Sequence, residues 1–215
     1  MQADLEPLRR SIKEPIPAIF HAWDLLSQAV DAHLGGDHPA AEALFRKANL
    51  SEVWRWTNPA WGPSPRDLRG NVRFWKPDND SRSVPEAARD PQRDATQAVK
   101  AAVLARDGYR CRYCGIPVVH ADIRKIAQKI YPDAIPWNRR EDEQHAAFQC
   151  LWLQYDHVVP HSHGGSSSED NIVITCALCN YGKDSFTLKQ LGISDPRQRP
   201  PERVSWDGLE RLRSR

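Results

Sequence analysis

The sequence has no long apolar run, and this absence bears on where the protein works. No stretch of the 215 residues approaches the length of a membrane span, and residues 1–17 carry early acidic side chains without the apolar core of a secretion signal. We therefore expect no membrane association and a location in the cytoplasm. The sequence also has no internal repeat and no low-complexity tract.

A strong net charge is also missing. The 30 Lys and Arg residues oppose 28 Asp and Glu residues, which leaves a net charge of +2 at pH 7. Bulk charge therefore neither requires nor excludes a nucleic-acid partner, and a binding surface would have to come from local clusters of basic side chains. The 40% hydrophobic residues, with eight Trp among them, suffice for a sizeable core in one domain or in a small domain with an appendage.

Cysteine is scarce, but four of the five cysteines form a pattern. Cys111 and Cys114 make one CxxC turn, and Cys176 and Cys179 make a second. At this spacing two thiolates on one tight turn can bind the same tetrahedral Zn²⁺ ion, with bonds of about 2.3 Å. Disulfides are the weaker explanation for a chain expected in the cytoplasm, and paired CxxC turns favour a structural zinc site over a redox motif. Cys150 lies outside the pattern and is predicted to be a small buried apolar side chain.

Apolar periodicity predicts several helices. Residues 18–34 have helical spacing that stops at a Gly pair, and Asp37 is a candidate N-cap for a second helix to residue 48, so that the two can pack as a hairpin. A helix capped by Asp94 or Thr96 leads into the first cysteine pair. In the insertion that follows, apolar periodicity predicts a helix around residues 123–130 and another over residues 140–153. The segment 206–215 is either a short basic helix that docks or a frayed tail.

Residues 51–76 combine aromatic and basic side chains. Aromatic faces beside guanidinium groups can stack bases and contact phosphates, which makes the arginines of this segment candidate nucleic-acid contacts. Burial statistics favour the alternative that the Trp residues anchor the core, and both hold if Trp lies inside and Arg outside. The Pro- and Ser-containing residues 77–93 are predicted to form a linker. The candidate contacts are Arg55, Arg66, Arg69 and Arg73.

The stretch from residue 155 to residue 183 gathers the residue types needed for chemistry. Asp156 and His157 end a short apolar-alternating segment, a polar loop with two Gly follows, and residues 172–175 are rich in β-branched side chains. This order predicts a hairpin. A short helix after it would bring Asn180 and Lys183 back toward the Asp156–His157 end, so that two strands and a helix surround one site.

This stretch resembles the HNH nuclease family, whose ββα-metal motif has an Asp–His pair on the first strand, an Asn before the second, and a His or Asn on the helix. The three signature positions are His157, Asn171 and Asn180. The third is Asn, as in the HNH domain of RNA-guided CRISPR nucleases. The resemblance extends back to residues 106–115 and covers residues 96–187.

The resemblance implies an α+β fold. We expect a ββα-metal, treble-clef-like nuclease core with a mainly helical N-terminal section and a helical insertion. The expected organisation is an N-terminal section over residues 1–93, a nuclease domain over residues 94–192, and a tail rich in Pro and Arg over residues 193–215.

Phosphodiester hydrolysis requires a nucleophile, a proton acceptor and a cation near the phosphate. His157 can act as the general base, because a neutral imidazole accepts a proton near physiological pH. Asp156 and Asn180 offer oxygen ligands for Mg²⁺ or Mn²⁺. The resemblance implies that Asn171 is a scaffold that fixes the orientation of His157. Phosphate contacts are expected from Lys183 and, unless it is simply an exposed loop residue, from His163.

These expectations describe a metal-dependent DNA endonuclease, for which family analogy favours restriction or phage defence. One alternative is a zinc-stabilised nucleic-acid-binding protein that does not cleave. Another is a nuclease that a partner protein directs to its target. Whether two chains pair as a homodimer to cut both strands stays open.

Overall fold

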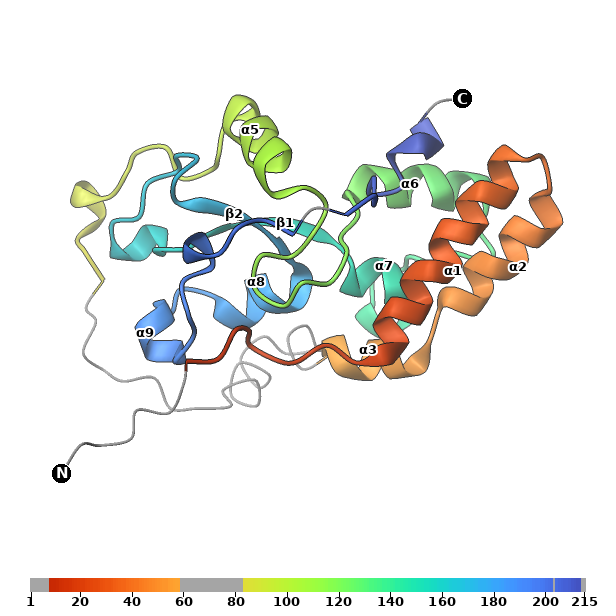
Figure 1. The fold of residues 1–215 in the computed structure, drawn as a ribbon, viewed down its shortest axis with the longest axis horizontal. Coiled ribbons are helices and arrows are strands. Elements are labelled where there is room, and N and C mark those ends of the chain that lie inside the picture. The colour runs from red at the N-terminus through yellow and green to blue at the C-terminus, as the bar shows by residue number, and fades with distance from the viewer. Residues whose placement is uncertain (1–7, 59–82, 203, 214–215) are drawn as a thin grey trace.

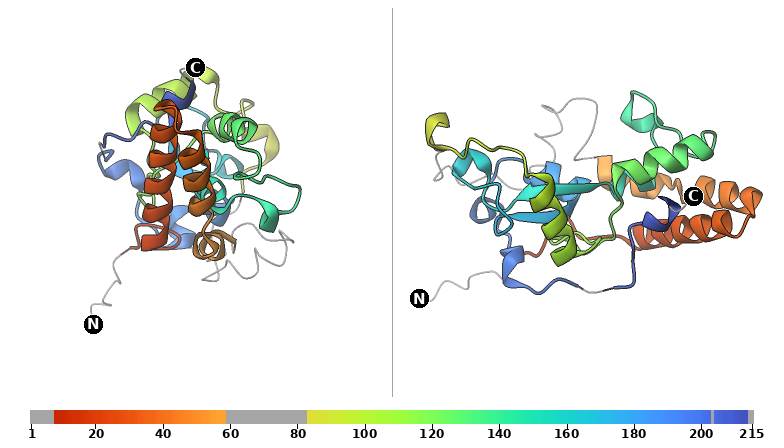
Figure 2. Two further views of the ribbon diagram at one scale, coloured as in Figure 1. Left: turned by 90° about the vertical axis from the view of Figure 1, so that its right-hand side faces the viewer. Right: turned by 90° about the horizontal axis from the view of Figure 1, so that it is seen from above.

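The computed structural model describes residues 8–58, 83–202 and 204–213. A helical hairpin lies at one end of the molecule, and a two-stranded sheet with its flanking helices lies toward the other (Figures 1 and 2). The chain is thus a mixed α+β protein, in agreement with the expected class. Among the described helices, none combines the length and the apolar character needed to cross a membrane.

The hairpin consists of α1 (Pro17–Leu34) and α2 (His38–Ala48), which pack against each other. Asp37 caps α2, since its Oδ1 accepts a hydrogen bond from the main-chain N–H of Ala40 at 3.0 Å. The apolar faces of both helices are buried, with Leu26 and Phe45 fully inaccessible. The sequence prediction of a helical hairpin is confirmed.

The first part of the Trp- and Arg-rich segment forms α3 (Ser51–Thr57). Trp56 is buried and its Nε1 donates to Glu14 O at 2.8 Å, while Arg55 is exposed. On this helix the Trp side chain therefore serves the core and the Arg faces outward. The other predicted contacts of this segment, Arg66, Arg69 and Arg73, lie outside the described residues.

The helices around the first cysteine pair are α5 (Gln97–Asp107) and α6 (Ala121–Ile130), both at the predicted places. Thr96 is the N-cap of α5, accepting from Val99 N at 3.3 Å. The predicted helix over residues 140–153 is wrong. The segment instead holds a 3-10 turn at Glu141–Glu143 and the short α7 (Ala146–Cys150).

The helix α7 ends early because the residues after it hydrogen-bond to other parts of the chain. Leu153 N donates to Val119 O at 2.9 Å, and Leu153 is already the first residue of the sheet. On its other side α7 packs against the N-terminal hairpin: His145 Nε2 donates to Phe45 O at 2.8 Å, and the rings of Phe45 and Phe148 stack with centroids 6.3 Å apart. The insertion therefore joins the helical hairpin to the sheet.

The sheet and the helix after it form a ββα unit. Strand β1 (Leu153–His157) pairs antiparallel with β2 (Ile172–Cys176), with His157 opposite Ile172, and α8 (Ala177–Lys183) packs against both strands. Every residue of β2 is buried. The Asp107 carboxylate, at the end of α5, accepts a hydrogen bond from the buried Ile174 N at 3.0 Å and so joins α5 to β2.

The C-terminal part of the chain docks on the rest. It contains α9 (Leu188–Leu191) and 3-10 turns at Pro196–Gln198 and Glu210–Arg213. Trp206 is buried, with its Nε1 donating to Val118 O at 3.0 Å and its ring edge-on to Trp23. Just after α9, the C-terminal part pairs with the N-terminal segment: Arg9 N donates to Gly192 O at 3.0 Å, and Ser194 N donates to Arg9 O at 2.8 Å. Of the two alternatives for residues 206–215, docking is the one found for the described part, residues 206–213.

Candidate active site and metal centre

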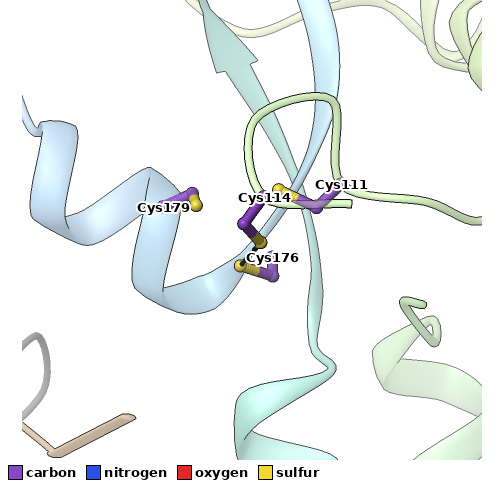
Figure 3. A group of neighbouring side chains, drawn as sticks. All are labelled: Cys111, Cys114, Cys176 and Cys179. Atoms are coloured by element: carbon purple, nitrogen blue, oxygen red, sulfur yellow. Dashed lines mark hydrogen bonds between the residues drawn. The ribbon is translucent and has the colours of Figure 1, made fainter. Parts of the chain in front are cut away.

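The four patterned cysteines meet at one place. They come from the loop after α5, from the end of β2 and from the first turn of α8 (Figure 3). All four are buried, and their sulfur atoms lie within 4.8 Å of one another. Four Zn–S bonds of about 2.3 Å in a tetrahedron place the sulfur atoms about 3.8 Å apart. The 3.6 Å between the sulfurs of Cys114 and Cys176 fits this geometry, and none of the five cysteines forms a disulfide. The group is Cys111, Cys114, Cys176 and Cys179.

The fifth cysteine is separate from this group. Cys150 is fully buried in α7, and burial raises the pKa of its thiol to about 12. A thiol with such a pKa stays protonated and weakly reactive at neutral pH. Its burial confirms the sequence prediction of a small apolar side chain.

Asp156, the predicted metal ligand, is only 4% exposed and has two protein donors. The Tyr113 hydroxyl donates to Oδ2 at 2.9 Å, and Lys183 Nζ donates to Oδ1 at 3.1 Å. Burial raises the pKa of the Asp156 carboxyl, while the Lys183 charge and the Tyr113 hydrogen bond act in the opposite direction. Tyr113 was not found from the sequence, although its place between the two cysteines of the first turn could have drawn attention to it.

Lys183 lies at the end of α8 and is 1% exposed. Besides Asp156, its ammonium group donates to His157 O at 2.7 Å. In this arrangement the charge of Lys183 is directed at the end of β1 rather than at solvent. Its predicted contact with phosphate would require the ion pair to open, and it stays a prediction.

His157 is the last residue of β1 and is partly buried. Its Nε2 lies 2.9 Å from Ser167 Oγ. Burial lowers the pKa of His157, and the nearby His161 and Lys183 lower it further, against the opposing effect of two carboxylates. The imidazole is therefore neutral over a wider pH range than that of an ordinary His, as a proton acceptor must be.

Asn171 connects the end of β1 to the polar loop. Its Oδ1 accepts from Val159 N, and its Nδ2 donates to Val159 O and to Ser166 O, each at 2.9 Å. Gly165 makes room for this contact, because a Cβ there would lie 1.8 Å from Val159 O and 2.7 Å from Asn171 Nδ2. The amide thus holds the backbone just after His157, which is the geometry that a scaffold residue needs.

The remaining predicted residues lie around this unit. Asn180 is partly buried on α8, directly after Cys179 of the four-cysteine group. His163 ends a 3-10 turn at His161–His163, and its Nδ1 lies 3.1 Å from Ser162 Oγ. Arg55, on α3, belongs to a different part of the fold.

The segment predicted to be a linker contributes to the site. Within the described part of that segment, residues 83–93, Asp90 accepts from Ser167 N at 3.0 Å, and Gln92 O accepts from the Ser167 hydroxyl. Neither Asp90 nor Ser167 was singled out from the sequence, because both are ordinary turn residues whose importance lies in a contact across about 75 positions of the chain.

Residues 144–186 match the family model of the HNH endonuclease. These residues form an HNH endonuclease domain. The match spans β1, the polar loop, β2 and α8, and it supports a nuclease of this superfamily acting on nucleic acid. Comparisons with curated proteins and with solved structures gave no match.

The two metal proposals fit this HNH domain to different degrees. The four-cysteine group has the ligands and spacing of a closed structural zinc site. Asp156 and Asn180 provide the hard oxygen atoms that Mg²⁺ or Mn²⁺ prefers. A cation at Asp156 would, however, meet the Lys183 ammonium group 3.1 Å from Oδ1. The residues as arranged hold Asp156 in an ion pair, so they do not form a ready divalent-cation site.

Proposed function

We propose that this protein is a metal-dependent endonuclease that hydrolyses phosphodiester bonds in DNA, with His157 as the general base. The observation that carries the proposal is the position of His157: a partly buried imidazole of lowered pKa, at the end of β1 in a domain that matches the HNH endonucleases. A neutral imidazole held in place can accept a proton from an attacking water.

The other residues of the motif would support this step. Asn171 would hold the backbone after His157, and the zinc group would fix the start of α8. A divalent cation, if bound through Asp156 and Asn180, would supply positive charge for the phosphate and the leaving oxygen. Because Lys183 occupies Asp156 Oδ1, such binding would require the lysine to move. A role in restriction or phage defence belongs to the same proposal. A nuclease that a partner protein directs to its target is an alternative to it, and pairing of two chains to cut both strands stays open.

Cleavage of supercoiled plasmid tests the function. Wild type and His157→Ala are incubated with Mg²⁺, with Mn²⁺ or with excess chelator. We expect cutting by the wild type only with a divalent cation, and no cutting by His157→Ala. His21→Ala is the matched control, because His21 is exposed on α1, outside the HNH domain.

The products also bear on assembly, since nicked circles indicate one active site at a time and linear product indicates paired cuts. Equal cutting by wild type and His157→Ala, with both proteins folded, would disprove the role of His157. Wild-type cutting that is unaffected by chelator would disprove the metal dependence.

The ion pair at Asp156 favours a second candidate, a zinc-stabilised protein that binds nucleic acid without cutting it. Its basis is that both carboxylate oxygens already have protein donors. Under this alternative the wild type binds plasmid in a gel-shift assay, with affinity that falls as salt rises, yet leaves it supercoiled with every metal.

A further inference from the structure

His157 Nε2 is tied to a segment far from it in the sequence. It lies 2.9 Å from Ser167 Oγ, and that oxygen lies 2.5 Å from Gln92 O and 2.9 Å from Arg93 O. Ser167 is 6% exposed. The hydroxyl therefore links the imidazole to two main-chain carbonyl groups, with little access for water.

The chemistry of the hydroxyl sets the direction of these hydrogen bonds. A serine hydroxyl carries one hydrogen, and carbonyl oxygens can only accept. Because Gln92 O and Arg93 O both lie close to Ser167 Oγ, the hydroxyl hydrogen must point to them. Ser167 Oγ then accepts from His157, so Nε2 carries the hydrogen. In a neutral imidazole the lone pair is then on Nδ1.

Further hydrogen bonds hold the carbonyl groups in place. The Asp90 carboxylate accepts from Gln92 N at 2.9 Å and from Ser167 N at 3.0 Å, so it holds the main chain of Gln92 and that of Ser167 next to each other. The main-chain oxygen of Asp90 accepts from His161 Nε2 at 2.7 Å. Residues 83–93 are thus fastened to the polar loop of the HNH domain at several points.

We propose that Ser167 is a positioning residue for His157. Its hydroxyl, directed by the carbonyl groups of Gln92 and Arg93, fixes the imidazole as the Nε2–H tautomer and leaves Nδ1 to accept the proton of the attacking water. Residues 83–93 complete the active site, although they lie outside the part of the chain that matches the family. This inference rests on the proposed nuclease function.

The tautomer is measured directly by ¹⁵N NMR of the histidine side chains, with His157 assigned by comparison with His157→Gln. At a pH where the ring is neutral, the wild type is expected to show a protonated Nε2 and an unprotonated Nδ1. Ser167→Ala is expected to show averaged shifts from both tautomers. It should also lower kcat for plasmid cleavage by at least about tenfold, with DNA affinity unchanged.

Two variants separate positioning from a general loss of structure. Ser168→Ala is the matched control, because this neighbour is exposed and its hydroxyl contacts that of Ser166, and it should keep the wild-type spectrum and rate. Ser167→Thr keeps a hydroxyl group and should recover most of the lost rate. Zinc content and thermal melting confirm that each variant is folded.

An Nδ1–H tautomer in the wild type would overturn the inference without any variant. Unchanged spectra and rates in Ser167→Ala, measured beside a wild type that cuts DNA, would also overturn it and leave the nuclease function standing. A wild type that cuts no DNA would instead overturn the nuclease function and the catalytic part of this inference together.

Discussion

Lys183 Nζ lies 3.1 Å from Asp156 Oδ1, and both side chains are at most 5% exposed. This ion pair joins the end of α8 to the end of β1. Removal of one charge from a buried ion pair destabilises the fold, because the other charge is then left desolvated and unpaired.

Lys183→Met should therefore destabilise the fold strongly. It leaves the Asp156 carboxylate buried with the Tyr113 hydroxyl as its remaining side-chain donor, and we expect the free energy of unfolding to fall by about 3–5 kcal/mol. Urea denaturation followed by circular dichroism measures the change. Lys125→Met is the control, since the Asp122–Lys125 pair is exposed and its loss should change little. A small effect of Lys183→Met would show that the pair is not a structural tie.

Zinc removal should unfold the start of α8. We expect one zinc ion per chain by elemental analysis, and Cys179→Ser or a strong chelator should lower zinc content and thermal stability together. Cys150→Ala should keep the zinc, because this thiol lies outside the four-cysteine group. A zinc-free Cys179→Ser protein with wild-type melting would refute the zinc assignment.

Gly165→Ala should loosen the site without touching any charged group. The added Cβ would overlap Val159 O and press on the amide of Asn171. Overpacking of this kind costs about 1–3 kcal/mol, and it should also reduce cleavage through displacement of the backbone after His157. In Gly35→Ala, by contrast, the added Cβ meets nothing closer than 3.4 Å, so wild-type stability is expected. Wild-type melting of Gly165→Ala would contradict the close packing at this turn.

His145 should make the fold sensitive to mild acid. Its ring is fully buried, and burial lowers its pKa from 6.5 to about 4. Between these values the unfolded chain binds a proton that the folded chain does not, so stability falls as the pH drops from 6.5 toward 4. At about 1.4 kcal/mol per pKa unit, the loss amounts to about 3 kcal/mol.

The measurement is urea denaturation over this pH range, for wild type and for His145→Asn, which keeps a side-chain acceptor at the start of α7. The variant should show a shallower dependence on pH, whatever its absolute stability. Equal slopes for the two proteins would mean that His145 is not the responsible group.

The features that the sequence predicted correctly are those with local signals. Helical periodicity and an Asp N-cap located α1 and α2, and the run of β-branched residues located β2. Paired CxxC turns were enough to predict the four-cysteine group, because the spacing of ligands within one turn is a local property. Asn171 lies before β2 and its amide bonds to the main chain of Val159, while its role as a scaffold for His157 stays a prediction.

The features that the sequence did not reveal depend on contacts between distant residues. The helix expected over residues 140–153 is instead a 3-10 turn followed by the short α7. Leu153 already belongs to β1, where it lies opposite Cys176 and donates to Val119 O, and no local pattern predicts these partners. Lys183 was expected to contact phosphate. Helical spacing predicts the side of α8 on which Lys183 lies, but it does not predict that the side chain pairs with the Asp156 carboxylate. Ser167 contacts residues 90–93 across the fold. From composition alone, the segment that contains residues 90–93 was predicted to be a linker, so this contact was missed.

The main-chain bonds between Arg9 and residues 192–194 also bear on synthesis in the cell. Arg9 leaves the ribosome long before its partners exist. At about 5–20 residues per second, residue 193 follows residue 9 by about 10–40 seconds. Cys176 follows Cys114 by 62 residues, so at the same rate a nascent chain carries the thiols of Cys111 and Cys114 without the second cysteine pair for about 3–12 seconds. The main-chain bonds of Arg9 can form only after residue 194 has been made.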